Sequence, residues 1–169
     1  MTRRLTRKRK LMKPTSLKEF GDYLIHIGFA TSGTLIPCDT EEVDEIRVSL
    51  GVNKLPEQYE SFLKIMGRQA GTLLPGTDFF FPSIVELMDE ARELLVLNNG
   101  NPLMRPGSLI IGMHGGYQLY WLEPGEPSGA VCFYSEVGNT VKQNFPSLLD
   151  FLVYEAEREL ELRLKRATR

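Results

Sequence analysis

The chain has 169 residues, enough for one domain with a hydrophobic core and too few for two ordinary domains. Its formal net charge of −2 hides an asymmetry: residues 1–13 hold seven basic and no acidic residues, whereas residues 14–169 hold 13 basic and 22 acidic residues. The two cysteines, Cys38 and Cys132, lack the spacing of a disulfide framework, which argues against a disulfide-stabilised secreted fold and favours a reducing compartment.

Residues 1–14 form a basic arm that we expect to be disordered, because runs of like charge with little apolar surface rarely fold. Such an arm can contact the phosphates of nucleic acid, yet it has no aromatic residue to stack on bases. The residues that follow it are too charged for a signal peptide, and the longest uncharged run, residues 106–122, is too rich in glycine to span a membrane. We therefore predict a cytoplasmic protein. Met12 is an alternative start of the chain.

Residues 15–38 are predicted to form an N-terminal helical extension and a connector. Ser16 and Glu19 have the spacing of a capping box, in which a hydroxyl and a carboxylate each satisfy a free backbone donor at a helix start. The helix that follows is amphipathic and ends at Gly28. Its apolar positions are Leu17, Phe20, Leu24 and Ile27.

Residues 43–67 predict two short helices that are separated at Gly51. Asp39 or Thr40 opens the first helix, whose apolar residues recur at +3 and +7. Pro56 opens the second helix, where its missing N–H costs nothing. The predicted core positions are Val43, Ile46 and Leu50 in the first helix and Tyr59, Phe62, Leu63 and Met66 in the second.

The next segments predict a loop, a strand and a further helix. We expect a loop from residue 68 that ends in a short strand at Phe79–Phe81. Ser83 and Glu86 then make a second capping box, and the helical spacing continues to about Leu97. Residues 98–102, with three Asn, a Gly and a Pro, must end this helix.

Residues 108–112, 117–122 and 130–134 are rich in β-branched and aromatic residues and are bounded by glycine and proline turns, which predicts an antiparallel meander. A last helix begins near Ser147, whose first half should dock on the sheet. The charged end of that helix, residues 156–169, is expected to project into water or to meet a partner, with supporting pairs Glu159–Arg163 and Glu161–Lys165.

Four segments together resemble the SMI1/KNR4 family of the SUKH superfamily, and they place an SMI1/KNR4-like domain at residues 39–155. The resemblance implies an α+β fold, a small antiparallel β-sheet flanked by several α-helices, and no enzymatic activity. Many bacterial members look like immunity proteins that bind and block a toxin domain, often a nuclease, and fungal members resemble regulatory hubs. The segments are VDEIRVSLGVNKLPEQYESFLKIMG, SIVELMDEARELL, SLIIGMHGGYQLYWLEPGEPSGAVCFYS and PSLLDFL.

No catalytic, metal-binding or cofactor-binding motif is apparent. His26, His114 and the two cysteines have no spacing typical of a metal site. The glycine-rich residues 112–116 lack the Gly-Lys-Ser/Thr end of a phosphate-binding loop, so a tight turn explains them. There is no nucleophile elbow, and no histidine can be assigned as the base for a serine or cysteine. We predict no catalytic residues, no metal and no cofactor.

The candidate site is a partner-binding surface. An acidic cluster lies at the start of the first helix after the connector, and helix-start chemistry explains about half of it. We expect the rest to steer a basic partner, together with carboxylates of the loop between two strands. Tyr117, Tyr120 and Trp121 are candidate anchors, of which strand alternation sends some into the core. The candidate acids are Asp39, Glu41, Glu42, Asp44 and Glu45 in the cluster and Glu123 and Glu126 in the loop.

The predicted function is a non-catalytic, protein-binding one, and the leading candidate is a bacterial immunity protein that neutralises a toxin by direct binding. A regulatory or scaffold protein of the same fold without a toxin partner is the first alternative. A nucleic-acid-associated protein that acts through the basic arm is the second.

Overall fold

The computed structural model describes residues 12–97, 104–125, 129–136 and 140–168, with only the backbone described at 95–97 and 140–144. Within these ranges the chain forms six α-helices and one short 3-10 helix. They are α1 (Leu17–His26), η1 (Ser32–Thr34), α2 (Thr40–Ser49), α3 (Glu57–Met66), α4 (Ser83–Glu86), α5 (Met88–Leu97) and α6 (Leu148–Ala167).

The main sheet is antiparallel and its strands follow one another in chain order. They are β3 (Thr77–Asp78), β4 (Leu109–His114), β5 (Gln118–Leu122), β6 (Val131–Ser135) and β7 (Thr140–Phe145). The predicted meander is therefore confirmed for β4, β5 and β6. A separate pair is formed by β1 (Leu35–Ile36) and β2 (Gln69–Ala70). The strands β1, β2, β3 and β7 were not predicted, because β1, β2 and β3 are only two residues long and β7 is mostly polar in sequence.

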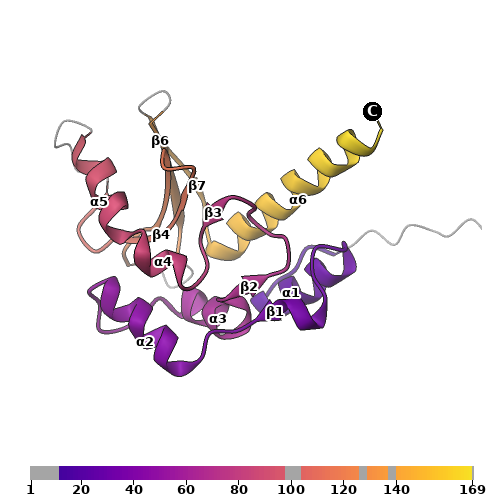
Figure 1. The fold of residues 1–169 in the computed structure, drawn as a ribbon, viewed down its shortest axis with the longest axis horizontal. Helices are drawn as coiled ribbons and strands as arrows, with labels where there is room; N and C mark the ends of the chain where they lie inside the picture. Colours follow the sequence, from indigo (N-terminus) through magenta and orange to yellow (C-terminus); the bar gives the residue numbers. More distant parts are fainter. Residues whose placement is uncertain (1–11, 98–103, 126–128, 137–139, 169) are drawn as a thin grey trace, which may run out of the picture.

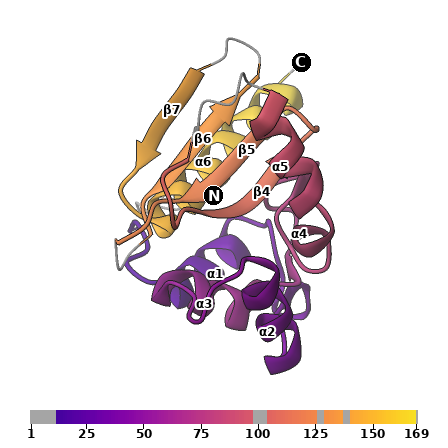
Figure 2. The same ribbon diagram turned by 90° about the vertical axis from the view of Figure 1, so that its left-hand side faces the viewer.

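The helices cover the sheet on both sides, which confirms the predicted α+β class. Helix α6 crosses one face of the sheet and α5 lies on the other side (Figure 1). Helices α1, α2 and α3 gather beyond one end of the strands, and Figure 2 shows them below the sheet with α6 behind it. Each face of the sheet can therefore bury the alternate side chains of its strands.

The helix pair predicted from residues 43–67 is confirmed, although Pro56 is the N-cap residue of α3 and not its first helical residue. Phe62 and Met66 are fully buried, as are Tyr59 and Leu63, so the whole predicted stripe of α3 faces the core. In α2, Ile46 is fully buried and Val43 nearly so. The apolar residues of both helices recur with the 3.6-residue period because one face of each helix packs against the other elements.

Serine side chains cap α1 and α6 as the sequence predicts. The Ser16 hydroxyl accepts a hydrogen bond from the backbone N–H of Glu19 at 3.2 Å, and Ser147 accepts one from the N–H of Asp150 at 3.1 Å. The second half of the first capping box differs from the prediction. The Glu19 carboxylate accepts from the backbone N–H of Thr15, at 2.8 Å, rather than from that of Ser16.

Three predictions for residues 79–97 are wrong. The strand lies at Thr77–Asp78, and the Phe79–Phe81 segment follows it outside the strand. The Phe79 ring is buried in the core, edge-to-face with Phe62 at 5.3 Å between ring centres. Ser83 does not cap a helix: Pro82 holds the cap position of α4, without a side-chain cap bond. The predicted single helix is divided into α4 and α5. The predicted break at 98–102 lies outside the described residues.

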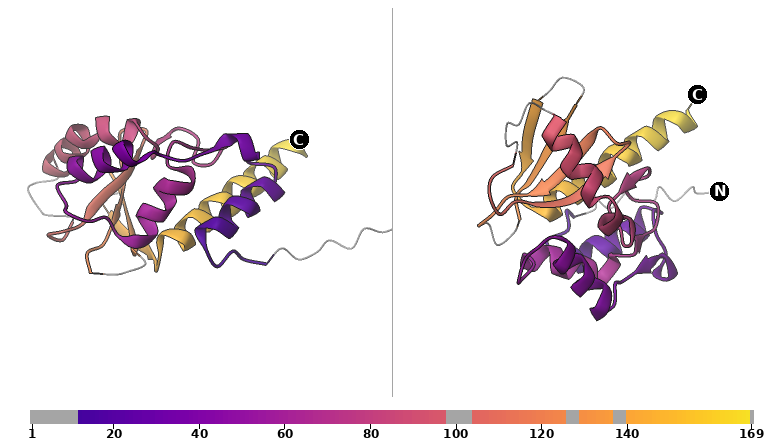
Figure 3. Two further views of the ribbon diagram at one scale, coloured as in Figure 1. Left: turned by 90° about the horizontal axis from the view of Figure 1, so that it is seen from below. Right: turned by 60° about the vertical axis from the view of Figure 1, so that its left-hand side comes forward.

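The segment before residue 38 belongs to the same hydrophobic core as the rest of the chain. Phe20 and Leu24 of α1 are fully buried, and α1 runs beside α6 (Figure 3). After α1, the guanidinium of Arg163 in α6 lies over the ring of Phe29, 4.0 Å from its centre, and donates to the Thr72 hydroxyl at 2.8 Å. The charged half of α6 is thus tied to the segment that follows α1 and to the loop at Thr72. Its predicted pairs are also confirmed, with 3.0 Å between Glu159 and Arg163 and 3.7 Å between Glu161 and Lys165.

Candidate protein-binding surface

Two acids of the predicted cluster serve the start of α2. Asp39 is the N-cap residue, which settles the choice between Asp39 and Thr40. Its carboxylate accepts from the N–H of Glu42, and the Glu42 carboxylate accepts from the N–H of Asp39, both at 3.0 Å. Glu42 also pairs with Arg68 at 3.1 Å. These two carboxylates are therefore committed to the fold, in a reciprocal capping box.

The remaining acids of α2 differ in what they contact. Asp44 forms an ion pair with Arg47, one turn further along, at 3.1 Å. Glu41 and Glu45 are exposed, and neither has an ion-pair partner among the side chains that the structure describes. The part of the cluster that is free to attract a partner thus consists of these two carboxylates, with Asp44 beside them.

Glu123 is an interior residue, with only 13% of its side chain exposed. Its Oε1 accepts from the indole N–H of Trp121 at 2.7 Å, and Arg105 Nε lies 3.2 Å from its Oε2. Burial, and next a hydrogen bond to Glu123, raise the pKa of the Cys132 thiol to about 12. Glu123 therefore satisfies buried donors instead of adding to an exposed acidic surface. Glu126 lies outside the described residues.

Of the candidate aromatic anchors, Trp121 is wrong, because its side chain is fully buried in the core. It pairs with Cys132, and strand alternation places it on the face opposite to Tyr120, whose ring packs against Phe151 of α6. Tyr120 points to the other face and is 6% exposed, whereas Tyr117, in the turn before β5, is 37% exposed. Strand alternation separates these neighbours. Tyr117 and Glu123 flank opposite ends of β5. Helix α2, which carries the acidic cluster, lies at the far corner of the molecule from the free end of α6 (Figure 1). The predicted residues do not form one patch.

A cluster of aromatic side chains that the sequence did not predict as a site lines a hollow between α6 and strands β5–β7, which we name the aromatic hollow. Its volume is about 450 Å³. The rings touch one another in series, with centre-to-centre distances of 5.1 to 5.4 Å. Tyr154 stands at its edge and is 49% exposed. The lining residues are Gln118, Tyr120, Phe133, Phe145, Phe151, Tyr154, Glu155 and Arg158.

The aromatic hollow contains one buried charge. Only 9% of the Glu155 side chain is exposed, and its Oε2 accepts from Arg158 Nε at 3.1 Å and also from Arg158 Nη2. Burial, and next the Glu155 carboxylate, raise the pKa of the neighbouring Tyr120 hydroxyl to about 12. The Tyr120 ring is therefore neutral at physiological pH and presents an uncharged π face beside a carboxylate.

A second hollow of about 350 Å³ continues the first one toward the β4–β5 turn. The two share Gln118, Tyr120 and Arg158, and the second is also lined by Tyr117, one of the predicted anchors. His114 closes it on the sheet side, where its Nδ1 lies 2.8 Å from the Thr77 hydroxyl. One concave surface therefore runs along α6.

Sequence patterns contain a partial signal for the aromatic hollow. Phe151 and Tyr154 are three residues apart, which places them on one face of α6, and Gln118 and Tyr120 are two apart, which places them on one face of β5. What the sequence could not supply is the register that sets Phe133 opposite Tyr120.

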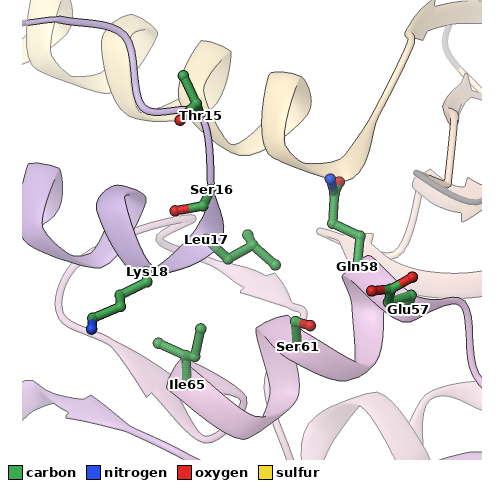
Figure 4. A pocket seen from close by; sticks show the side chains of 8 residues that line it. All are labelled: Thr15, Ser16, Leu17, Lys18, Glu57, Gln58, Ser61 and Ile65. Atoms are coloured by element: carbon green, nitrogen blue, oxygen red, sulfur yellow. The ribbon is translucent and has the colours of Figure 1, made fainter.

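A more polar crevice lies between the starts of α1 and α3, with a volume of about 480 Å³ (Figure 4). Figure 4 shows Gln58 pointing out of this crevice toward the start of α6, where its Oε1 accepts from the N–H of Leu149 at 2.8 Å. The other lining groups are mostly exposed ends of side chains. They are Thr15, Ser16, Leu17, Lys18, Glu57, Ser61 and Ile65.

The reactive side chains are poorly placed for chemistry. Both cysteines are buried free thiols, and burial also raises the pKa of Cys38 to about 12. His26 is exposed, and no group of three or more His, Cys, Asp or Glu side chains in the described part of the chain is arranged to hold a metal ion. No helix among the described residues is both long and apolar enough to cross a membrane.

These features describe an α+β domain with a small antiparallel sheet between helices and a concave exterior. The sequence model of the SMI1 / KNR4 family (SUKH-1) matches residues 37–153, and the chain belongs to this family. Domains of this family are generally non-catalytic and are associated with protein–protein interaction. No curated protein matches the chain. The match begins just before α2 and ends within α6, so α1 and the charged half of α6 lie outside it.

Proposed function

We propose that this protein is a bacterial immunity protein, which acts in the cytoplasm and neutralises a cognate toxin by binding it directly. It binds without catalysing a reaction. The observation that carries the proposal is membership of the SMI1/KNR4 family, whose domains are consistent with an immunity role. A toxin with a basic active-site surface, such as a nuclease, suits the acidic body of the chain.

Two features of the exterior support this proposal. Glu41 and Glu45 of α2 are exposed and have no ion pair among the described residues, so their charge is available to a basic partner. Opposite charges raise association rates by roughly 10- to 1,000-fold at low salt, which helps an inhibitor reach a toxin before its target does. The concave surface along α6 offers buried aromatic contact area, on which affinity usually depends.

The test is co-expression with a toxin candidate, which is to be sought in the adjacent reading frames as a large secreted protein with a variable C-terminal domain. We expect growth to be restored and the two proteins to elute together at a 1:1 ratio. An unrelated acidic protein of similar size and charge is the control. Toxicity that persists with both proteins present and folded would refute the immunity role and favour a regulatory or scaffold role.

A further inference from the structure

We propose that the aromatic hollow binds an arginine side chain that protrudes from the protein partner. The identity of the partner rests on the proposed function, whereas the recognition chemistry rests on the residues of the hollow alone. The inference concerns a different surface from the acidic helix α2, which acts at long range. It assigns the short-range contact to the aromatic hollow beside α6.

The first argument is the state of the Glu155 carboxylate. A buried ionised carboxylate is costly unless donors satisfy its oxygens. Both N–H groups that Arg158 offers donate to Oε2. Among the described side chains the donor to Glu155 is Arg158, which bonds only Oε2 and so leaves Oε1 to solvent or to an incoming donor from the hollow that Glu155 lines. An incoming guanidinium has several N–H groups in one plane and can donate to this second oxygen.

The second argument is the surrounding π surface. Tyr120 and Phe151 lie 5.2 Å apart between ring centres, and Tyr120 and Phe133 lie 5.3 Å apart. Tyr154 extends this wall at the open edge of the hollow. A cation over aromatic faces is attracted by their quadrupoles, and a planar guanidinium also stacks on them. Lysine has the charge but lacks the planar group, and acidic or neutral side chains lack the charge, so the hollow favours arginine.

The third argument is that the internal partner is easily displaced. The Glu155 side chain is only 9% exposed, but that of Arg158 is 53% exposed, so a displaced Arg158 guanidinium is solvated by water. Arg158 lines both hollows, so it can swing toward solvent when another guanidinium enters. The hollow's volume of about 450 Å³ lies in the range of pockets that hold small ligands, and its open side admits a side chain carried on another protein.

The direct experiment is an NMR titration of the full chain labelled with ¹⁵N. The probe is N-acetylarginine amide, and the matched control is N-acetylcitrulline amide, which has nearly the same shape and no charge. We expect saturable shifts of the backbone amides of Tyr120, Phe133 and Glu155 with the arginine probe and none with citrulline. Equal responses to the two probes, no response, or shifts confined to other surfaces would overturn the proposal.

Variants sharpen this test. Glu155→Gln keeps the side-chain shape and should weaken arginine binding by at least about fivefold, since the charged acceptor is lost. Arg158→Ala removes the competing guanidinium and should strengthen binding, a gain that a purely structural role for Arg158 does not produce. Glu157→Gln, at an exposed position of the same helix, is the control. Unchanged affinity in both test variants would refute the role of Glu155.

The partner experiment separates this inference from the proposed function. If the toxin candidate binds the protein and Glu155→Gln weakens the complex, both stand. If the complex is unaffected by Glu155→Gln and by Tyr154→Ala, immunity stands and the inference fails. If co-expression gives no rescue but the arginine probe still saturates the hollow, the inference stands and the proposed function fails.

Discussion

Gln58 in α3 accepts a hydrogen bond at 2.8 Å from the backbone N–H of Leu149, a residue 91 positions away and the second residue of α6. The first N–H groups of a helix have no acceptor within the helix, so a side chain from elsewhere must satisfy them when they are shielded from water. The amide of Gln58 therefore sets where α6 begins relative to α3. This position in turn determines where the aromatic residues of α6 meet the sheet.

Gln58→Ala should lower the free energy of unfolding by about 1–2 kcal/mol, because it leaves the N–H of Leu149 without an acceptor. Gln58→Glu should retain most of the stability, since a carboxylate also accepts and its charge suits a helix N-terminus. Urea unfolding followed by circular dichroism measures both. Gln69→Ala, at an exposed position of β2, is the control. Equal losses in the two Gln58 variants would contradict this explanation.

Phe20→Ala should cost about 3–5 kcal/mol of stability, because it opens a cavity where α1 meets the core. Ile25→Ala changes a residue of the same helix that is 39% exposed and should cost less than about 1 kcal/mol. Thermal and urea unfolding of both variants check this. If both variants lowered the free energy of unfolding by the same small amount, α1 would not be part of the cooperatively folding unit.

Asp150→Asn should alter the pH dependence of stability. Hydrogen bonds from Lys13, at 2.7 Å, and from Ser147 hold the pKa of Asp150 below its usual value. A carboxyl with a lowered pKa in the folded state stabilises the protein above its unfolded pKa of about 3.9, and this contribution disappears as the pH falls through the folded pKa.

The variant should therefore be less stable than the native chain near neutral pH, and the two should converge at acidic pH. Unfolding midpoints measured across a pH series test this. Asp22→Asn removes an exposed carboxyl that has no ion pair among the described residues and should show no such convergence. A difference between the Asp150 variant and the native chain that stays constant with pH would disprove the linkage.

Reversing the two free charges of α2 should slow association with the toxin candidate. Glu41→Lys together with Glu45→Lys should reduce the association rate by roughly tenfold at low salt. The effect should vanish near about 1 M salt, where charges are screened within ~3 Å. Glu86→Lys with Glu90→Lys makes the same change in net charge at other exposed positions and is the matched control. An equal slowing in both pairs would show that net charge, and not α2, steers the partner.

Both thiols should be inert in the folded protein. With their pKa values raised to about 12 by burial, Cys38 and Cys132 carry almost no thiolate near pH 8, and thiolate is the reactive form. A chromogenic disulfide reagent should therefore react slowly in buffer and quickly in urea. Cys38→Ala and Cys132→Ala assign each phase. Rapid reaction under native conditions would reveal an exposed, activated cysteine.

The sequence predicted the elements whose apolar residues follow one period. Tyr59, Phe62, Leu63 and Met66 specify α3 because their spacing has meaning only on a helix, and all four are fully buried. Phe79–Phe81 misled the prediction, since three consecutive aromatic residues show no period and their packing decides their conformation. β7 was missed because Lys142, Gln143 and Asn144 interrupt the apolar pattern of its sequence, TVKQNF.

The candidate site was less predictable because it depends on which groups meet in space. Charge in the sequence suggested Glu123 as a surface residue, but the indole N–H of Trp121 and Arg105 hold it inside. Tyr117 does line a concave surface, although the acids of α2 do not border it. The aromatic hollow joins residues of three strands and one helix, and no spacing in the chain encodes that junction.

The contact between Arg163 and Phe29 joins two segments that both lie beyond the region shared with the family. One precedes residue 37 and the other follows residue 153, so each serves as the other's packing partner against the common core. A recombinant fragment trimmed to the shared region would lose both and would uncover apolar surface that these helices normally shield. The boundaries for expressing this protein should therefore be drawn from its tertiary contacts and not from the extent of its homology.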